Sequence, residues 1–206
     1  MNFIKRKLKS DNLIERITFC IICFFGLFLT VTILSYFLLP EGVLIGKQSA
    51  NFEMSANIFC SSIQIFMWNM ISVTVIVIGS LFAQKKIEDK NYLSIGYTAF
   101  FVLTIINAVT LGTWSFSVQT EAVPLIERLV GFFNIINNGG LLEMLGQLFV
   151  VTSLASISIV LISAKKTTTK KLSDIKLNKY EKIGVLIGIT LIYIGALIES
   201  ISIVSI

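Results

Sequence analysis

The stretch IGVLIGITLIYIGALIESISIV, residues 183–204, decides the fold of this chain. A helix needs about 20 apolar residues to cross a bilayer, and this stretch is long enough. One charged residue, Glu199, interrupts it. An intramembrane carboxylate is costly unless it has a partner, a proton or water. The stretch therefore predicts a membrane-spanning helix that carries an acidic group in need of an explanation.

The rest of the composition agrees with a membrane location. Of the 206 residues, 55% are hydrophobic and only 14% are charged, compared with about 25% charged residues in a typical soluble domain. The mean hydropathy is +0.86. We therefore expect residues 1–206 to form a single all-α membrane domain, a polytopic helix bundle.

Residue types that the chain lacks exclude several kinds of chemistry. There is no histidine, so the chain cannot build a histidine metal site or a Ser-His-Asp triad. Cys20 and Cys23 form a C-x-x-C pair, but their neighbours are apolar and would not lower a thiol pKa. We expect no metal and no cofactor, and the sequence identifies no catalytic residue.

Hydropathy divides the chain into five predicted transmembrane helices. They cover about residues 17–39, 58–83, 93–116, 141–164 and 183–204. Residues 123–136 are half polar, and Pro124 suits the first turn of a new helix. Because Glu127 and Arg128 disfavour a full crossing, we predict an interfacial or re-entrant helix on the outer side.

The distribution of lysine and arginine predicts the orientation in the membrane. Residues 1–16, 84–90 and 165–182 are rich in basic residues, whereas 41–57 and 117–128 carry only Lys47 and Arg128. Basic loops remain on the cytoplasmic side. The N-terminus is thus expected inside and the C-terminus outside. The basic loops also suit contact with anionic lipid or a cytoplasmic partner.

Small and polar residues mark one face of the last predicted span. Gly184, Gly188, Gly195 and Glu199 fall close to a single stripe. Glycines spaced by four residues let a neighbouring helix approach closely. This stripe is therefore a predicted packing face, with Glu199 directed into the protein.

Other predicted spans carry polar residues of their own. Glu143 and Gln147 are four residues apart and so share a helix face, while Asn69 and Asn107 lie in the second and third spans. We predict an intramembrane polar site formed by Glu143, Glu199, Asn107, Asn69 and Gln147. Glu199 is expected to bond to Asn107, to Gln147 or to water in an outward cavity. A pair of structural staples and a functional proton or substrate site both remain open.

Four short motifs resemble the stage II sporulation protein M family of small multispan bacterial proteins. They are WNM at 68–70, INAVTLG at 106–112, NNGGLLEMLG at 137–146 and ALIESIS at 196–202. By this resemblance, the family's motif positions fall on Asn69, Asn107, Gly140, Glu143, Ala196 and Glu199. The chain departs from the pattern at Gly139, where the family has histidine, and at Ala108, where it has glycine.

The resemblance implies a multi-pass protein of the bacterial cytoplasmic membrane. One branch of the family is encoded with circular bacteriocins, which implies a non-enzymatic subunit of a maturation, secretion or immunity complex. Its expected partners are membrane lipid, other multispan proteins, an ATPase subunit and a peptide substrate, but no nucleic acid. A homo-oligomer is an alternative arrangement.

Two further hypotheses belong to different functional classes. The first is a sporulation-type membrane scaffold, as in the other branch of the family. The second is an intramembrane peptidase or ligase component that uses Glu143 and Glu199. A short precursor peptide gene and an ATPase gene nearby would favour the bacteriocin hypothesis over both.

Overall fold

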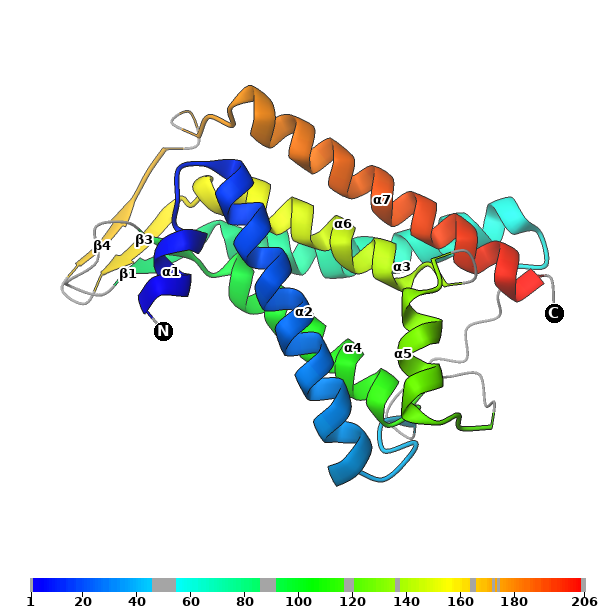
Figure 1. The fold of residues 1–206 in the computed structure, drawn as a ribbon. Coiled ribbons are helices and arrows are strands. Elements are labelled where there is room, and N and C mark those ends of the chain that lie inside the picture. The colour runs from blue at the N-terminus through cyan, green and yellow to red at the C-terminus, as the bar shows by residue number, and fades with distance from the viewer. Residues whose placement is uncertain are drawn as a thin grey trace.

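The computed structural model describes residues 2–45, 55–85, 92–116, 121–135, 138–163, 166–171, 173 and 175–204. The chain is mostly helical (Figure 1). The predicted boundaries at residues 136 and 164 fall outside the described residues. In chain order the elements are α1 (Asn2–Leu8), α2 (Leu13–Leu38), α3 (Ile58–Ser80), β1 (Phe82–Lys85), β2 (Leu93–Ser94), α4 (Gly96–Gly112), α5 (Leu125–Phe133), α6 (Gly140–Ser153), the 3-10 turn η2 (Leu154–Ser156), β3 (Val160–Ser163), β4 (Lys166–Thr169) and α7 (Lys179–Val204).

Three of the helices, α2, α3 and α7, are long and apolar enough to cross a membrane. They contain 26, 23 and 26 residues. Asn12 and Asn57 begin two of them, because each side chain accepts hydrogen bonds from backbone N–H groups of the first turn. These three helices correspond to the predicted spans 17–39, 58–83 and 183–204, and they indicate a multi-pass membrane protein. α3 ends earlier than predicted, at Ser80, because residues 82 and 83 belong to β1.

The two remaining predicted spans contain shorter apolar helices. α4 has 17 residues, and α6 together with η2 covers residues 140–156. At about 1.5 Å per residue, 17 residues reach about 25 Å, which is less than the hydrocarbon thickness of about 30 Å. The predicted spans 93–116 and 141–164 are longer than these helices, which end at residues 112 and 156.

The all-α prediction is wrong at one end of the molecule, where a small sheet forms. The strand order is β2-β1-β3-β4, with β1 and β3 parallel and both outer pairs antiparallel. Phe82 lies opposite Val160 in the central pair. Strands β2 and β3 and the first half of β1 use residues predicted as the ends of spans, whereas β4 lies in a segment predicted as a basic loop. β-branched side chains, such as Val160 and Ile162 of β3 and the threonines of β4, favour strands.

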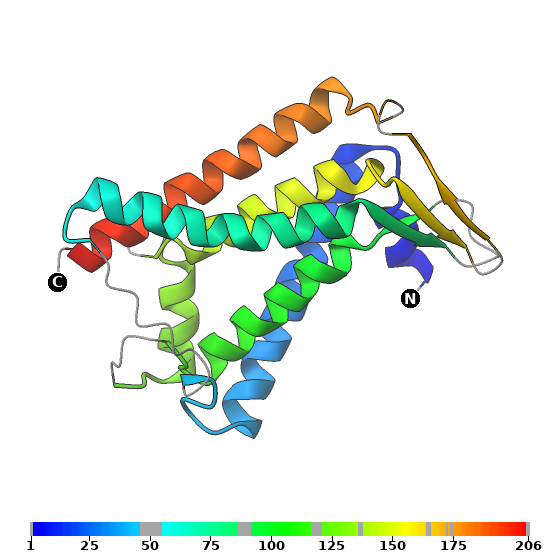
Figure 2. The same ribbon diagram turned by 180° about the vertical axis from the view of Figure 1, so that it is seen from behind.

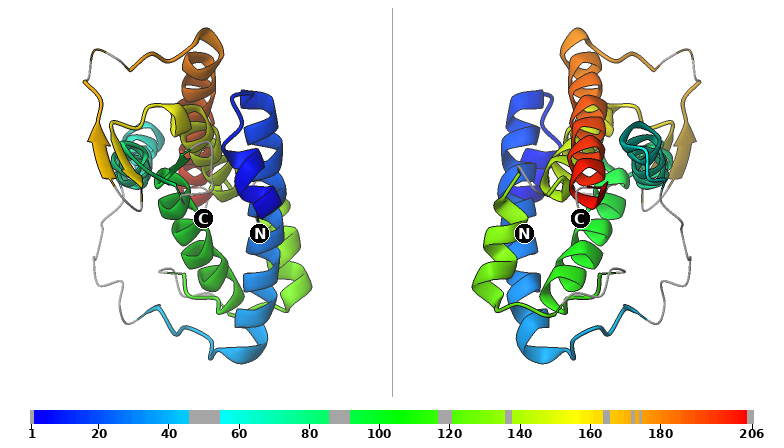
Figure 3. Two further views of the ribbon diagram at one scale, coloured as in Figure 1. Left: turned by 90° about the vertical axis from the view of Figure 1, so that its left-hand side faces the viewer. Right: turned by 90° about the vertical axis from the view of Figure 1, so that its right-hand side faces the viewer.

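The helices form two groups that diverge from the sheet. We call the end that carries the N-terminus, the sheet and the start of α7 the sheet end. From there α3, α6 and α7 run together in one direction, while α2 and α4 descend in another (Figures 1 and 2). The views from the two ends of the molecule show the start of α2 near the start of α7 (Figure 3), where Arg16 and Glu181 form an ion pair.

Glycines let α6 and α7 pack almost backbone to backbone. A Cβ atom added to Gly188 would lie 2.7 Å from the carbonyl oxygen of Gly146, and one added to Gly146 would lie 2.5 Å from that of Gly188. A Cβ at Gly184 would lie 2.1 Å from the hydroxyl of Ser153, and one at Gly195 would lie 2.6 Å from the Cγ of Glu143. The glycine face of α7 is thus in contact with α6.

α5 is a nine-residue helix within the range predicted for an interfacial or re-entrant helix. At about 1.5 Å per residue it is too short to cross a bilayer. Arg128 is 2% exposed and holds α5 to the ends of other helices. Its guanidinium donates to the carbonyls of Val123 and Gly112, each at 2.6 Å, and pairs with Glu41 at 2.5 Å. Arg128 therefore anchors α5 and caps the last turn of α4.

Candidate ligand-binding cavity

A cavity of about 350 Å³ lies between the two groups of helices. Polar side chains of α3, α4 and α6 gather around it, together with one from the segment before α6. These are Asn69, Ser72, Asn107, Thr110, Asn138, Glu143 and Gln147. The structure thus brings together four of the five residues predicted for the polar site. Because Asn107 is exposed, the cavity reaches the surroundings along α4.

Glu143 is the only acidic group among the described residues that line this cavity. Its side chain is 8% exposed. The Asn69 side chain is close enough to interact with the carboxyl group, but the oxygen Oε1 is buried and has no hydrogen-bond partner among the described residues. A buried polar atom of this kind costs free energy in the unbound protein. This oxygen is therefore the strongest chemical feature of the cavity.

The start of α6 determines where the Glu143 carboxyl lies. Gly139 precedes the helix, and the side chain of Asn138 accepts a hydrogen bond of 2.9 Å from the N–H of Gly140. Glu143 is in the first turn, where the positive end of the helix dipole favours a negative charge. Gly195 of α7 leaves the space that the Glu143 side chain fills. The short NNGG motif thus positions the carboxyl.

Apolar side chains form the remaining walls. Phe28 of α2 and Phe132 of α5 stack with their ring centres 4.3 Å apart, and both line the cavity with Leu103 and Met144. α5 therefore closes one side of the cavity through this stack and the Arg128 anchor. An apolar pocket with a few directed polar groups is typical of a site that binds a small molecule or a peptide segment.

Glu199, the fifth predicted site residue, lies next to the cavity. It is half-buried and is not among the described lining residues. It is close enough to Glu143 for the charges of the two carboxyl groups to interact. The neighbouring Ser200 hydroxyl donates to the carbonyl of Ile58 at 2.7 Å, which holds this turn of α7 against the start of α3. No hydrogen bond found in the described residues joins Glu199 to Asn107 or Gln147, the partners expected from the sequence.

Gly139, the position where the resembled family has histidine, belongs to the helix contact. A Cβ atom at this position would lie 2.0 Å from the carbonyl oxygen of Gly195. No side chain fits there unless α6 and α7 separate. Glycine at position 139 is therefore required by the contact between α6 and α7, and Glu143 has no neighbouring histidine to work with.

The chemistry that the cavity offers is hydrogen bonding and charge pairing. Within the described ranges, no three His, Cys, Asp or Glu side chains come together in a way that could hold a metal ion. Amide and hydroxyl groups surround one buried carboxyl. A hydrolytic mechanism with two carboxyl groups needs both to reach the same substrate, whereas only Glu143 lines the cavity.

A second buried charged site lies at the sheet end, and sequence reasoning missed it. Arg16 of α2 and Glu181 of α7 form an ion pair of 2.7 Å with both side chains 5% exposed. Glu181 also accepts from the Ser156 hydroxyl at 2.9 Å and from the N–H of Asn178 at 3.0 Å. In return, the Asn178 side chain accepts from the N–H of Glu181 at 2.9 Å. This reciprocal pair is a capping box that begins α7.

The capping box of this second site can be recognised in the sequence. Asn178 followed three residues later by Glu181 is close to the usual capping-box pattern, and it predicts a helix start earlier than residue 183. The partner Arg16 has no such signal, because it lies 165 residues away in the chain.

Comparisons with protein-family models, curated proteins and solved structures found no match to this chain.

Proposed function

We propose that the chain is a membrane subunit of a bacteriocin maturation, secretion or immunity complex, and that its cavity binds a peptide segment through Glu143. This proposal is based on the buried Oε1 atom of Glu143, which lines a polar cavity and has no hydrogen-bond partner among the described residues. A ligand with an ammonium or N–H group would supply the missing donor and offset the cost of the buried oxygen.

The shape of the cavity supports a peptide segment as the ligand. Its volume of about 350 Å³ falls in the range of sites for small ligands, about 300–1,000 Å³. The phenyl rings of Phe28 and Phe132 suit an apolar side chain. Asn69, Asn107 and Gln147 suit the N–H and C=O groups of a backbone. One apolar residue with its flanking peptide groups would use both kinds of surface.

A binding role accounts for the site better than catalysis does. Glu143 and Glu199 influence each other, but only Glu143 reaches the cavity. The proposed biological setting rests on the resemblance carried by Gly140, Glu143, Ala196 and Glu199. The setting would be the bacterial cytoplasmic membrane, with the sheet end inside, because the lysines of α1, β4 and the first turn of α7 lie there.

Photocrosslinking from the cavity mouth tests this proposal. A photoreactive amino acid replaces Asn107, which is exposed and lines the cavity, or Val102, which is exposed on the same helix but does not line it. The chain is co-expressed with a tagged bacteriocin precursor peptide. We expect crosslinks to the peptide from position 107, little from position 102, and loss of the position-107 crosslink in a Glu143→Met background. Equal crosslinking from both positions, or an unchanged yield after Glu143→Met, would refute the proposal.

A further inference from the structure

The sheet end contains a second cavity, of about 260 Å³, next to the buried Arg16–Glu181 pair. Basic side chains from three separate parts of the chain line it, namely Lys9, Arg16 and Lys170. The acid among its described lining residues is Asp11. When the Glu181 carboxylate that pairs with Arg16 is counted as well, three basic groups face two acidic groups among the described residues, so the lining retains a positive charge that favours an anion.

Arg16 has a donor that the ion pair does not use. The residue is 4% exposed, and its Nη2 atom donates to Glu181 at 2.7 Å. Its Nε atom is buried and has no hydrogen-bond partner among the described residues. Glu181 is already engaged by the Ser156 hydroxyl and by the N–H of Asn178. The guanidinium therefore retains an N–H group for a further acceptor at the wall of this cavity.

Two serine hydroxyls lie on the wall of the cavity, and one of them is available as a donor. Ser10 accepts a hydrogen bond from the N–H of Asn12, and Ser94 accepts one from the N–H of Gly96, each at 3.2 Å. Both serines line the cavity. The Ser10 hydroxyl already interacts with the Glu15 carboxylate, whereas the Ser94 hydroxyl still has its own proton to donate. The lining thus presents ammonium, guanidinium and hydroxyl donors, which together match an anion with several oxygen acceptors.

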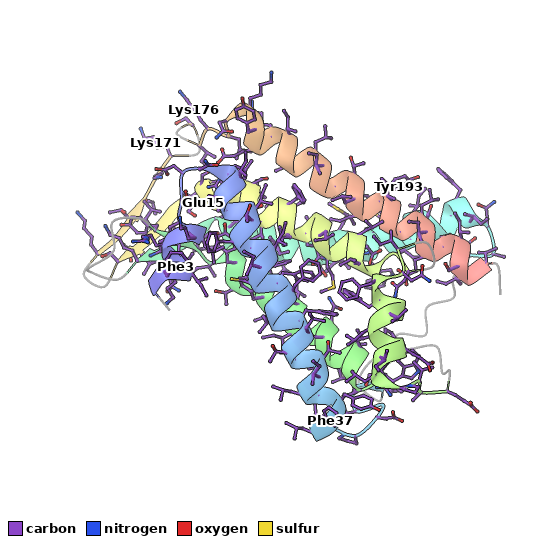
Figure 4. All side chains as sticks on the ribbon, in the orientation of Figure 1. Phe3, Glu15, Phe37, Lys171, Lys176 and Tyr193 are labelled. Carbon is purple, nitrogen blue, oxygen red and sulfur yellow. The ribbon has the colours of Figure 1, made fainter. Side chains whose placement is uncertain are left out.

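The backbone holds Lys170 at this place. Its N–H donates to the carbonyl of Ile159 at 2.9 Å, directly before strand β3. Lys171 and Lys176 lie at the same end of the molecule (Figure 4). Positive side chains at the cytoplasmic surface of a membrane attract phosphate-bearing anionic lipid.

We propose that this cavity binds a phosphate group, held by Arg16, Lys170 and the Ser94 hydroxyl, with Lys9 adding positive charge to the lining. The phosphate comes either from the headgroup of an anionic lipid or from free phosphate in solution. Binding there would join α2, the sheet and the segment before α7, and so stabilise the sheet end. This site is independent of the Glu143 cavity.

Ligand-dependent stability of the purified full chain tests the site. In one arm, the thermal midpoint in detergent is measured against added phosphatidylglycerol or phosphate-free diacylglycerol. In the other arm, inorganic phosphate is compared with chloride at equal ionic strength. We expect phosphatidylglycerol or inorganic phosphate to raise the midpoint, with Lys170→Gln weakening the apparent affinity about fivefold. Lys170 is exposed, so this variant should fold.

Lys176→Gln is the matched control, because Lys176 is exposed and is not among the described lining residues. Its affinity should equal that of the unaltered chain. Stabilisation by phosphatidylglycerol alone would assign the phosphate to a lipid headgroup, and stabilisation by inorganic phosphate would assign it to the free ion. No stabilisation in either arm, or equal effects of Lys170→Gln and Lys176→Gln, would overturn the proposal.

Discussion

Glu143 and Glu181 occupy similar places in α6 and α7, but their surroundings differ. Each is in the first turn of its helix, and they are 8% and 4% exposed. Glu181 has an arginine, a hydroxyl and a backbone N–H as partners. Glu143 lines a cavity and has one oxygen without a described partner. Glu181 therefore stabilises the fold. The buried carboxyl of Glu143 instead costs free energy in the unbound protein and is available to a ligand.

The largest expected effect on stability comes from removing the carboxyl group of Glu181. Glu181→Met leaves the Arg16 guanidinium buried and unpaired, so the free energy of unfolding should fall by about 3–5 kcal/mol. Equilibrium unfolding in detergent measures this. Glu127→Met is the control, because Glu127 is exposed in the first turn of α5, and its effect should stay within about 0.5 kcal/mol. Similar losses in both variants would contradict a structural role for Glu181.

A methyl group at the α6–α7 contact should have a smaller effect. Gly139→Ala places a Cβ atom against the backbone of Gly195, which has no flexible end to move aside. We expect a loss of about 1–3 kcal/mol in unfolding free energy and a displaced Glu143. Gly131→Ala is the control, since a Cβ there has no atom within 4 Å. If Gly139→Ala proves as stable as Gly131→Ala, the close contact of α6 and α7 is wrong.

Glu199→Gln should have the smallest effect on stability. The side chain is half-buried and is not among the described lining residues, so an amide of equal size should change unfolding by less than about 1 kcal/mol. Crosslinking of the tagged peptide from position 107 should persist. Loss of the crosslink with normal folding would move Glu199 into the ligand site and weaken the contrast between Glu143 and the other acids.

Local patterns in the sequence predicted the parts of the fold that depend on composition. Long apolar runs predicted α2, α3 and α7, and Pro124 with Arg128 predicted a separate short helix. The strands were missed because residues 155–163 are as apolar as a membrane helix, and because β1 pairs with β3 only after distant segments meet. Short strands give a weak periodic signal.

The candidate site was predictable only in part. Helical spacing placed Glu143 and Gln147 on one face, and both line the cavity with Asn69 and Asn107. The position of Glu199 beside the cavity depends on how far α7 extends past the start of α6, which no local pattern shows. The contact of Arg16 with Glu181 joins the two ends of the chain, so its partner could not be inferred from spacing.

The free energy of unfolding of Glu143→Met, measured beside Glu181→Met, tests the central claim most directly. Methionine keeps the length of the side chain and removes the buried oxygen that has no described partner. If Glu143 serves a ligand, the variant should be as stable as the unaltered chain, or more stable by about 1 kcal/mol. A loss of about 3 kcal/mol or more, matching that of Glu181→Met, would show that Glu143 is a structural residue and would contradict the account.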